Sequence, residues 1–217
     1  MNIINQQLPF IKGFSIAVLF SILLLLIRIS KVESYFFLFL VWNLFLACIP
    51  YGITTILSFR KIHQNRFLFG IGFVCWLAFL PNAPYILTDL QHIRLSSLQS
   101  VWFDVLLILS FAINGLIVGF ASLRTMQKLL QEHFSKKTTN LITHLTLLLC
   151  GFGIYMGRIL RWNSWDLIQN PMDVLGDIFQ RIIFPIEHIN TWAFTIGFGS
   201  FLIITYRLIQ HYQKEYN

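Results

Sequence analysis

The chain has 217 residues, of which 56% are hydrophobic and only 12% are charged. Soluble domains carry about 25% charged residues, so a sequence with half that share cannot cover a water-facing surface. The formal net charge of +7 does not indicate nucleic-acid binding, because the basic residues stand in short clusters between apolar runs, as they do in membrane proteins. The composition predicts an all-α polytopic membrane helix bundle, formed as a single domain over residues 1–217 and in contact with the lipid bilayer.

Six apolar runs approach the roughly 20 residues that a spanning helix needs. They are residues 8–27, 35–59, 67–87, 101–123, 139–157 and 191–209. The first run has no basic leader and no small-x-small cleavage site, so it is interpreted as a retained span and not as a signal peptide. The three cysteines lie within apolar runs, show no metal-ligand spacing and are predicted to be small buried hydrophobic residues: Cys48, Cys75 and Cys150.

Lysines and arginines in the connections predict the orientation of the chain. Ten of the 16 fall on the side of the N-terminus: Lys12, Arg60, Lys61, Arg66, Arg124, Lys128, Lys136, Lys137, Arg207 and Lys214. The opposite side holds Arg28, Lys31, Arg94, Arg158, Arg161 and Arg181. Both termini are therefore predicted to be cytoplasmic. Seven of the nine acids fall on the outer side, which thus mixes both signs of charge: Glu33, Asp89, Asp104, Asp166, Asp173, Asp177 and Glu187.

The third run leads into a polar stretch, LPNAPYILTDLQHIR, at residues 80–94. A helix of 14 residues from Phe67 up to Pro81 covers roughly 21 Å, which is less than a hydrocarbon core about 30 Å thick. If the helix begins near Phe67, Pro81 and Pro84 break it at membrane depth, where irregular backbone must be buried in protein or line a wet cavity. In the alternative interpretation, the helix begins near Ile62 and the prolines only end it at the interface.

The candidate ligand contacts in this stretch are Asn82, Tyr85, Asp89, His92 and Arg94. Asn82 is predicted to cap a second short helix, because Ala83 and Pro84 follow it. Asp89 and His92 are three residues apart and share a face of a helix, so they are the candidate catalytic pair for acid–base chemistry. Two ligands do not make a zinc site, and no metal is predicted. The alternative is that Asp89 pairs with an arginine and only fixes helix packing.

The longest connection, residues 157–191, carries a second set of candidate ligand contacts, namely Arg158, Arg161, Trp162, Asn163 and Asp166. Asp104, which is predicted on the same side of the membrane, is a further candidate. Arg158 and Arg161 share a helical face just past the fifth run, and two such guanidinium groups suit a phosphate or carboxylate clamp. They are equally suited to pair with Asp89 and Asp104, or to reach lipid phosphates. Pairing with the acids is the favoured outcome, because an unpaired charge at this depth is costly.

The same connection continues with residues typical of a membrane surface. Trp162 and Trp165 suit the headgroup level. Asn163 and Asp166 have the spacing of an N-cap followed by an acidic N3 residue. Residues 173–188 space their apolar groups like an amphipathic helix on the outer surface.

Small and polar residues within the runs predict helix packing. Gly115-x-x-x-Gly119 and Gly153-x-x-x-Gly157 favour close approach of helices. Asn43 and Asn114 are expected to form interhelical hydrogen bonds. The sequence has no phosphate-binding glycine loop, nucleophile elbow, HExxH or CxxC motif.

Three segments resemble a bacterial family of multi-pass membrane proteins known as domain of unknown function 1361: LPNAPYILTDL (80–90), WFDVLLILSFAINGL (102–116) and FGIYMGRILRWNSWD (152–166). The spacing of these segments implies that the family domain covers most of the chain. The resemblance implies a protein of the bacterial cytoplasmic membrane. It brings no activity, substrate, cofactor or catalytic residue.

The sequence leaves three functions open. In the favoured one, the 80–94 and 157–166 segments build an outward-facing polar site for a small anionic ligand or a lipid headgroup. In the second, the chain is an enzyme acting on lipid or envelope precursors, with Asp89 or His92 as general base. In the third, the charges of an accessory protein only hold helices together. The absence of paired repeats disfavours a standard transporter, and the sequence indicates neither a cofactor nor an oligomeric state.

Overall fold

The computed structural model describes residues 3–59, 62–96 and 100–215, and every regular element among them is a helix. Among these described residues, six stretches are long and apolar enough to cross a membrane: Leu8–Val32, Phe36–Phe59, Arg66–Arg94, Val101–Gln131, Lys136–Arg158 and Ile189–Tyr212. The predicted all-α bundle with six spans is confirmed, and the third and fourth stretches continue further than predicted. Arg60 and Lys61, which entered the orientation count, lie outside the described residues.

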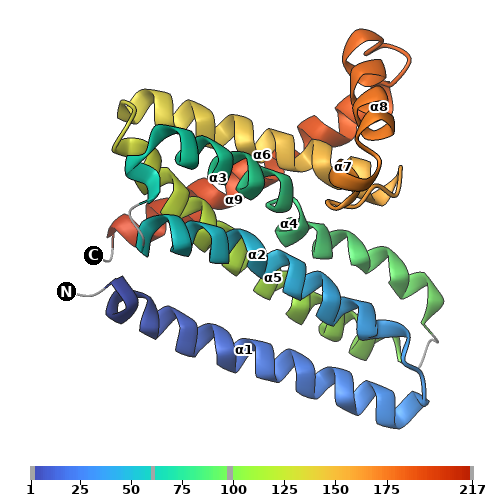
Figure 1. Ribbon diagram of the computed structural model, residues 1–217. Coiled ribbons are helices and arrows are strands. Elements are labelled where there is room, and N and C mark those ends of the chain that lie inside the picture. The colour runs from blue at the N-terminus through green and yellow to red at the C-terminus, as the bar shows by residue number, and fades with distance from the viewer. Residues whose placement is uncertain (1–2, 60–61, 97–99, 216–217) are drawn as a thin grey trace. The chain divides into compact units, whose positions relative to one another are not determined.

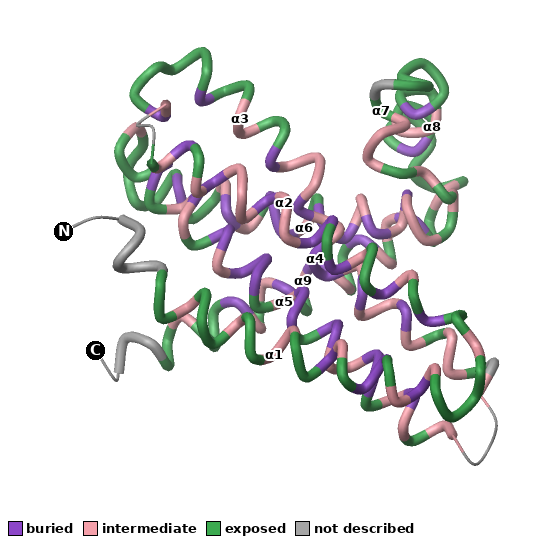
Figure 2. The backbone as a smooth tube through the Cα atoms, turned by 60° about the horizontal axis from the view of Figure 1, so that its bottom comes forward, coloured by how far each residue is buried: buried purple, intermediate pink, exposed green. Residues whose placement is uncertain are grey.

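The chain forms two compact units, Met1–Met126 and Gln127–Asn217. Unit 1 contains α1 (Ile3–Val32), α2 (Phe39–Phe59), α3 (Arg66–Phe79), α4 (Asn82–Tyr85), the 3-10 helix η3 (Ile86–Leu95) and most of α5 (Val101–Gln131) (Figure 1). Its core is apolar and joins buried residues of five of these helices, among them Leu25, Leu40, Ala83, Ile86 and Phe111. Along α1 buried positions alternate with exposed ones, as expected for a helix packed on one side only (Figure 2).

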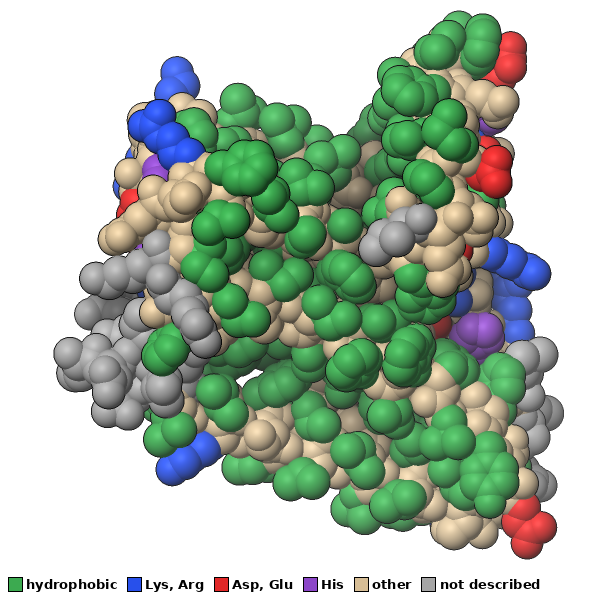
Figure 3. All heavy atoms as spheres, viewed as in Figure 1, with side chains coloured by type: hydrophobic (Ala, Val, Ile, Leu, Met, Phe, Trp, Pro, Cys, Tyr) green, Lys and Arg blue, Asp and Glu red, His purple; other side chains and the backbone are tan. Residues whose placement is uncertain are grey.

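The unpacked side of α1 is a stripe of large apolar side chains. Ile16, Leu19, Leu23 and Leu26 follow one another at helical spacing and are all exposed. Hydrophobic side chains accordingly cover the face of α1 that Figure 3 presents. A surface of this kind suits lipid, in which exposed apolar groups carry no penalty. The prediction that Cys75 is buried is wrong, because Cys75 is exposed on α3.

The start of α3 decides between the two interpretations of the third run. Asn65 caps the helix, because its side-chain oxygen accepts hydrogen bonds from the backbone nitrogens of Phe67 and Leu68. The helix therefore begins at Arg66, next to the predicted Phe67, and the alternative start near Ile62 is wrong. With 14 residues, α3 covers roughly 21 Å, so the polar stretch that follows lies within the length of the span.

The two prolines interrupt α3 without turning the chain away from a helical path. Pro81 has φ −58° and ψ −24°, and the following residues continue as α4 and then as the tighter η3. The predicted cap at Asn82 is wrong, because Asn82 is the first residue of α4 and Pro81 precedes it without a side-chain cap. Its amide nitrogen instead donates to the carbonyl oxygen of Phe79, 2.9 Å away. The side chain thus satisfies a backbone acceptor at the interruption.

Glycines bring α5 against the interrupted segment. A Cβ atom on Gly115 would lie 2.5 Å from the carbonyl oxygen of Ala83, and one on Gly119 would lie 2.6 Å from the Ala83 Cβ. The close approach predicted for Gly115-x-x-x-Gly119 is therefore confirmed, with α4 as the partner. The interhelical bonds predicted for Asn114 are also present, since its amide donates to Ala17 and to the Ser21 hydroxyl of α1.

Unit 2 contains the end of α5, α6 (Lys136–Arg158), the short α7 (Asp166–Gln169), α8 (Pro171–Ile183) and α9 (Ile189–Glu215). Helices α6 and α9 pack against each other over much of their length. Gly151 and Gly199 set the close approach, because a Cβ on Gly151 would lie 2.6 Å from the Thr195 carbonyl oxygen. The sequence pattern indicated Gly153 and Gly157 for a close helix approach instead. The α7–α8 segment joins α6 to α9 at one end of this pair.

Candidate functional site

Asp89 is a buried carboxylate on η3, with an exposed fraction of 1%. One carboxylate oxygen accepts a hydrogen bond from the Asn43 amide of α2 at 2.9 Å, and the other lies 3.9 Å from Nε2 of His92. A 3-10 helix has three residues per turn, so side chains three apart stand directly above one another. The predicted shared face of Asp89 and His92 is confirmed. The interhelical bond predicted for Asn43 is confirmed as well.

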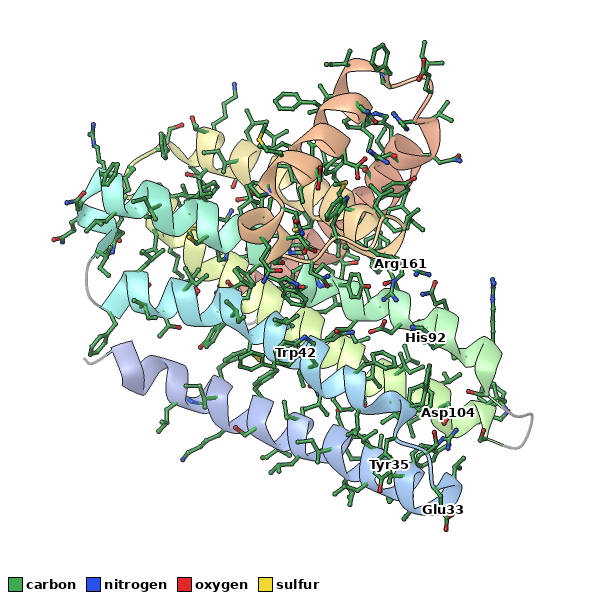
Figure 4. All side chains as sticks on the ribbon, turned by 45° about the vertical axis from the view of Figure 1, so that its right-hand side comes forward. Glu33, Tyr35, Trp42, His92, Asp104 and Arg161 are labelled. Carbon is green, nitrogen blue, oxygen red and sulfur yellow. The ribbon has the colours of Figure 1, made fainter. Side chains whose placement is uncertain are left out.

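His92 connects this buried carboxylate to the surface of unit 1. Its side chain is 26% exposed, whereas that of Asp89 is 1% exposed. Its ring lies against the rings of Phe36 and Phe39, with centroid distances of 5.6 and 5.1 Å. Figure 4 shows His92 on η3. A carboxylate that orients an imidazole is an arrangement able to hold or pass a proton.

Asp104 and Arg28 form a buried charge pair, and this corrects the partner predicted for Asp104. Asp104 is fully buried in the first turn of α5, and its two oxygens accept hydrogen bonds from Nε and Nη2 of Arg28 on α1. The phenyl ring of Phe37 lies 5.5 Å from the guanidinium carbon. Figure 4 shows Asp104 near the C-terminal end of α1. Asp104 was expected to pair with Arg158 or Arg161, and Arg28 was named from the sequence only among the basic residues of the outer side.

The other candidate residues of the 80–94 stretch differ in how far they are buried and in the hydrogen bonds that they form. Tyr85 is half-buried, and its carbonyl oxygen accepts a hydrogen bond from the Thr88 hydroxyl at 2.6 Å. Asn82 is half-buried and bonded to Phe79, as described above. Arg94 is exposed near the end of η3. Within this stretch, the structure therefore concentrates buried polar chemistry at Asp89 and His92.

In unit 2, Arg161 has a backbone conformation that is unusual for an arginine. Its φ is +65°, in the left-handed region, just after the C-terminus of α6. The backbone nitrogen of Trp162 then donates to the carbonyl oxygen of Met156 at 3.1 Å, which closes the helix end. Glycine is the usual residue at such a position, because it has no Cβ to clash. The Arg161 side chain is exposed, and among the described residues of its unit it has no hydrogen-bond or ion-pair partner.

Next to Arg161, a cluster of polar bonds ties the connection to α8 and α9. The indole nitrogen of Trp162 donates to a carboxylate oxygen of Asp177 at 2.6 Å, and Nη1 of Arg181 donates to the other at 3.0 Å. The indole nitrogen of Trp192, on α9, donates to the Arg181 carbonyl oxygen at 3.0 Å. We call these four residues the α8 clamp. Only Trp162 was a sequence candidate, although the spacing of Asp177 and Arg181 is that of a helical ion pair.

Asn163 and Asp166 stabilise the turn between Trp162 and α7. The Asp166 carboxylate reaches back and accepts from the backbone nitrogen of Asn163 at 2.6 Å and from its side chain at 3.2 Å. This is one half of the predicted capping arrangement. The other half is absent, because the N-cap of α7 is Trp165 and makes no side-chain cap bond. Arg158 is half-buried at the last position of α6.

The structure thus brings Asp89 and His92 together within unit 1, and Asn163 and Asp166 together within unit 2. A shared site of the two segments stays a prediction. Within residues 3–59, 62–96 and 100–215, no group of three or more His, Cys, Asp or Glu side chains is placed to hold a metal ion.

Comparison with known proteins places the chain in a family. Residues 42–205 match the family described as protein of unknown function (DUF1361). No curated protein and no solved structure matches the chain. The matched region covers all of the candidate residues and most of the six apolar stretches. The chain is therefore an integral membrane protein and belongs to the DUF1361 family.

Proposed function

We propose that the protein binds the phosphate of a lipid headgroup, or a small anion of the same chemistry, through Arg161 at the outer surface of a bacterial cytoplasmic membrane. The orientation rests on the excess of basic residues on the side of both termini. With the termini in the cytoplasm, the connection between the fifth and sixth spans lies outside.

The backbone of Arg161 is the observation that carries the proposal. A left-handed conformation costs a residue with a Cβ roughly 1–2 kcal/mol, and a glycine would avoid that cost. Among the described residues of its unit, no bond of the exposed Arg161 side chain offsets this cost. Strained residues of this kind gather at functional sites, where surrounding structure holds them.

The chemistry of the position agrees with an anionic ligand. Arg161 stands beside Trp162, three residues after the last residue of the fifth span, and both side chains suit the headgroup level. A guanidinium group presents a planar fork of donors that matches the oxygens of a phosphate. Arg158, the last residue of α6, is a second cation three residues earlier.

The test uses Arg161→Gly, a substitution that removes the guanidinium and relieves the backbone. The purified protein in an uncharged detergent is heated with dihexanoylphosphatidylglycerol, dihexanoylphosphatidylcholine or inorganic phosphate. At one hundred times Kd, a ligand stabilises the folded state by about 2.7 kcal/mol, so binding raises the unfolding midpoint. Phosphatidylglycerol is expected to raise the midpoint of the wild-type protein but not that of Arg161→Gly. A matching effect of inorganic phosphate identifies a small anion, and its absence identifies a lipid headgroup.

Glu33 offers a matched control. It is the other non-glycine residue with a positive φ among those described, at +51°, and it follows α1 as an exposed side chain. Glu33→Gly relieves the same kind of strain without removing a cation, so its lipid-induced shift should equal that of the wild type. An undiminished shift in Arg161→Gly, or no shift of the wild-type midpoint with any of the three ligands, contradicts the proposal.

The pair of Asp89 and His92 favours a second candidate function, an enzyme that modifies a lipid or an envelope precursor. Asp89 would orient His92, and the partly exposed imidazole would act as general base. Lipid profiling of a deletion strain tests this function. An enzyme requires a lipid to disappear and its precursor to accumulate, and complementation with Asp89→Asn must reproduce that pattern. A lipid profile unchanged by the deletion excludes the lipid-modifying form of this candidate.

A further inference from the structure

We propose that α8 lies in the interfacial layer of the bilayer, with Met172, Leu175, Phe179 and Ile182 against the acyl chains. This inference concerns a different surface from that of Arg161 and does not depend on it. It follows from how α8 distributes its side chains and from what holds the helix in place.

Helix α8 has three faces, one more than an ordinary amphipathic helix. Its packed face holds Val174 and Arg181, which are 4% and 6% exposed. Its apolar face is open, with Met172 79% and Phe179 56% exposed. At about 100° per residue, these faces and the third face stand roughly 120° apart.

The third face is exposed and carries no large apolar side chain. It consists of Asp173, Gly176 and Gln180, which recur at helical spacing. Figure 3 shows hydrophobic side chains on one side of the α8 region of Figure 1 and acidic groups on the other. The helix therefore presents one surface for protein, one for an apolar medium and one for water.

The α8 clamp prevents the helix from rolling to bury its apolar face. Asp177 is bonded to Trp162 and Arg181, and the Arg181 carbonyl oxygen is bonded to Trp192. These bonds hold Asp177 and Arg181 against the protein while the apolar face stays exposed. A water-soluble domain usually does the reverse and buries its apolar side chains. The exposed apolar face is thus a built feature of unit 2, and it needs an apolar partner.

The position of α8 in the chain indicates that this partner is lipid. One span ends at Arg158 and the next begins at Ile189, so the residues between them start and end at the same membrane surface. Figure 1 shows α8 steeply inclined to α6, and not packed alongside it. An interfacial helix of this kind buries its apolar face several ångströms into the headgroup and acyl boundary.

The charges of α8 indicate that the attraction is hydrophobic and not electrostatic. Its single basic residue, Arg181, is buried and paired with Asp177. Most amphipathic helices that bind anionic membranes carry lysines and arginines on an exposed face. Contact of α8 with the bilayer is therefore expected in uncharged phosphatidylcholine and is expected to be insensitive to salt.

The test compares neighbouring positions on the two exposed faces in the full chain. The three native cysteines are replaced by alanine, a single cysteine is placed by Phe179→Cys or Gln180→Cys, and each is labelled with a fluorophore. The protein is reconstituted in phosphatidylcholine vesicles. Lipids brominated in the acyl chains should quench the label at position 179 several-fold more than the label at 180, and aqueous iodide should show the opposite order.

A second pair, Leu175→Cys and Asp173→Cys, repeats the comparison if a label at position 179 impairs insertion. Equal access of iodide to both faces overturns the proposal. A label on the apolar face that is protected from iodide but also escapes the brominated lipids overturns it too, because that face is then covered by protein such as a second copy of the chain. A pattern seen only when anionic lipid is added contradicts the hydrophobic attraction.

Discussion

The charged residues of unit 1 and those of the connection between α6 and α9 differ in how far along the chain their hydrogen-bond partners lie. In unit 1, Arg28 reaches Asp104 from another helix, 76 residues away, and Asn43 reaches Asp89 from 46 residues away. In the connection, the bonds of the charged residues span less of the chain, with Asn163 to Asp166 three residues apart, Asp177 to Arg181 four apart and Trp162 to Asp177 fifteen apart. Arg161 stands outside both networks of its region.

The difference separates residues that hold helices together from residues that shape a surface. A buried pair between distant helices fixes which helices are neighbours, and either partner alone would be a buried charge without compensation. The shorter-range bonds fix the path of the connection and hold α8 in place, and they leave Arg161 exposed. Asp104, predicted from the sequence as a ligand contact, thus belongs with the helix-holding residues, and Arg161 is the ligand contact that we propose.

The largest effect is expected from breaking the pair of Arg28 and Asp104. Asp104→Ala leaves the buried guanidinium uncompensated, which costs about 3–5 kcal/mol of unfolding free energy. The variant should accumulate poorly in the membrane and lose most of its resistance to unfolding in detergent. The double variant Arg28→Met with Asp104→Leu removes both charges and should recover most of that stability. Normal stability of Asp104→Ala would contradict the helix-holding role.

A smaller loss is expected when the partner of Asp89 is removed. Asn43→Ala deletes one donor to a buried carboxylate, and hydrogen bonds to charged groups contribute about 1.5–3 kcal/mol. Thermal unfolding in detergent measures this loss. Asn163→Ala serves as the local counterpart, because its side-chain bond is exposed and its removal should change the midpoint much less. Equal losses in the two variants would remove the distinction between buried and local bonds.

The smallest effect concerns the predicted shared site of the 80–94 and 157–166 segments. Substitutions at independent sites add within about 0.3–0.5 kcal/mol, whereas coupled sites depart from additivity by more. If both segments contribute to one lipid site, Asp89→Asn and Arg158→Ala should be coupled by at least about 0.5 kcal/mol in the free energy of phosphatidylglycerol binding. Strict additivity would assign the two segments to separate tasks.

The sequence predicts the spans well, because the thickness of the bilayer dictates the length of each apolar run. It also predicts the shared face of Asp89 and His92, because helix geometry fixes it. It left the start of α3 open between Phe67 and Ile62, and the cap formed by Asn65 decides it. It does not predict that Arg28 meets Asp104. Spacing along the chain carries no information on which helices become neighbours. Nothing in the pattern around Arg28 therefore indicates a partner 76 residues away.

The sequence also does not predict the left-handed backbone of Arg161. Its spacing from Arg158 predicts instead that the two arginines share a helical face. The chain leaves α6 earlier, and the helix end turns through a left-handed residue that only the backbone reveals. Sequence patterns predicted the candidate residues of the connection. The structure separates those that bond within the protein, such as Asn163 and Asp166, from the exposed Arg161.

The division between helix-holding and ligand-binding charges is tested most directly by one comparison of lipid-induced stabilisation. The midpoint shift caused by dihexanoylphosphatidylglycerol is measured for the wild type, for Arg28→Met with Asp104→Leu, and for Arg161→Gly. The wild type and the double variant should show the same shift, and Arg161→Gly should show none while unfolding at or above the wild-type midpoint without lipid. A shift that is lost in the double variant but kept in Arg161→Gly would contradict the account.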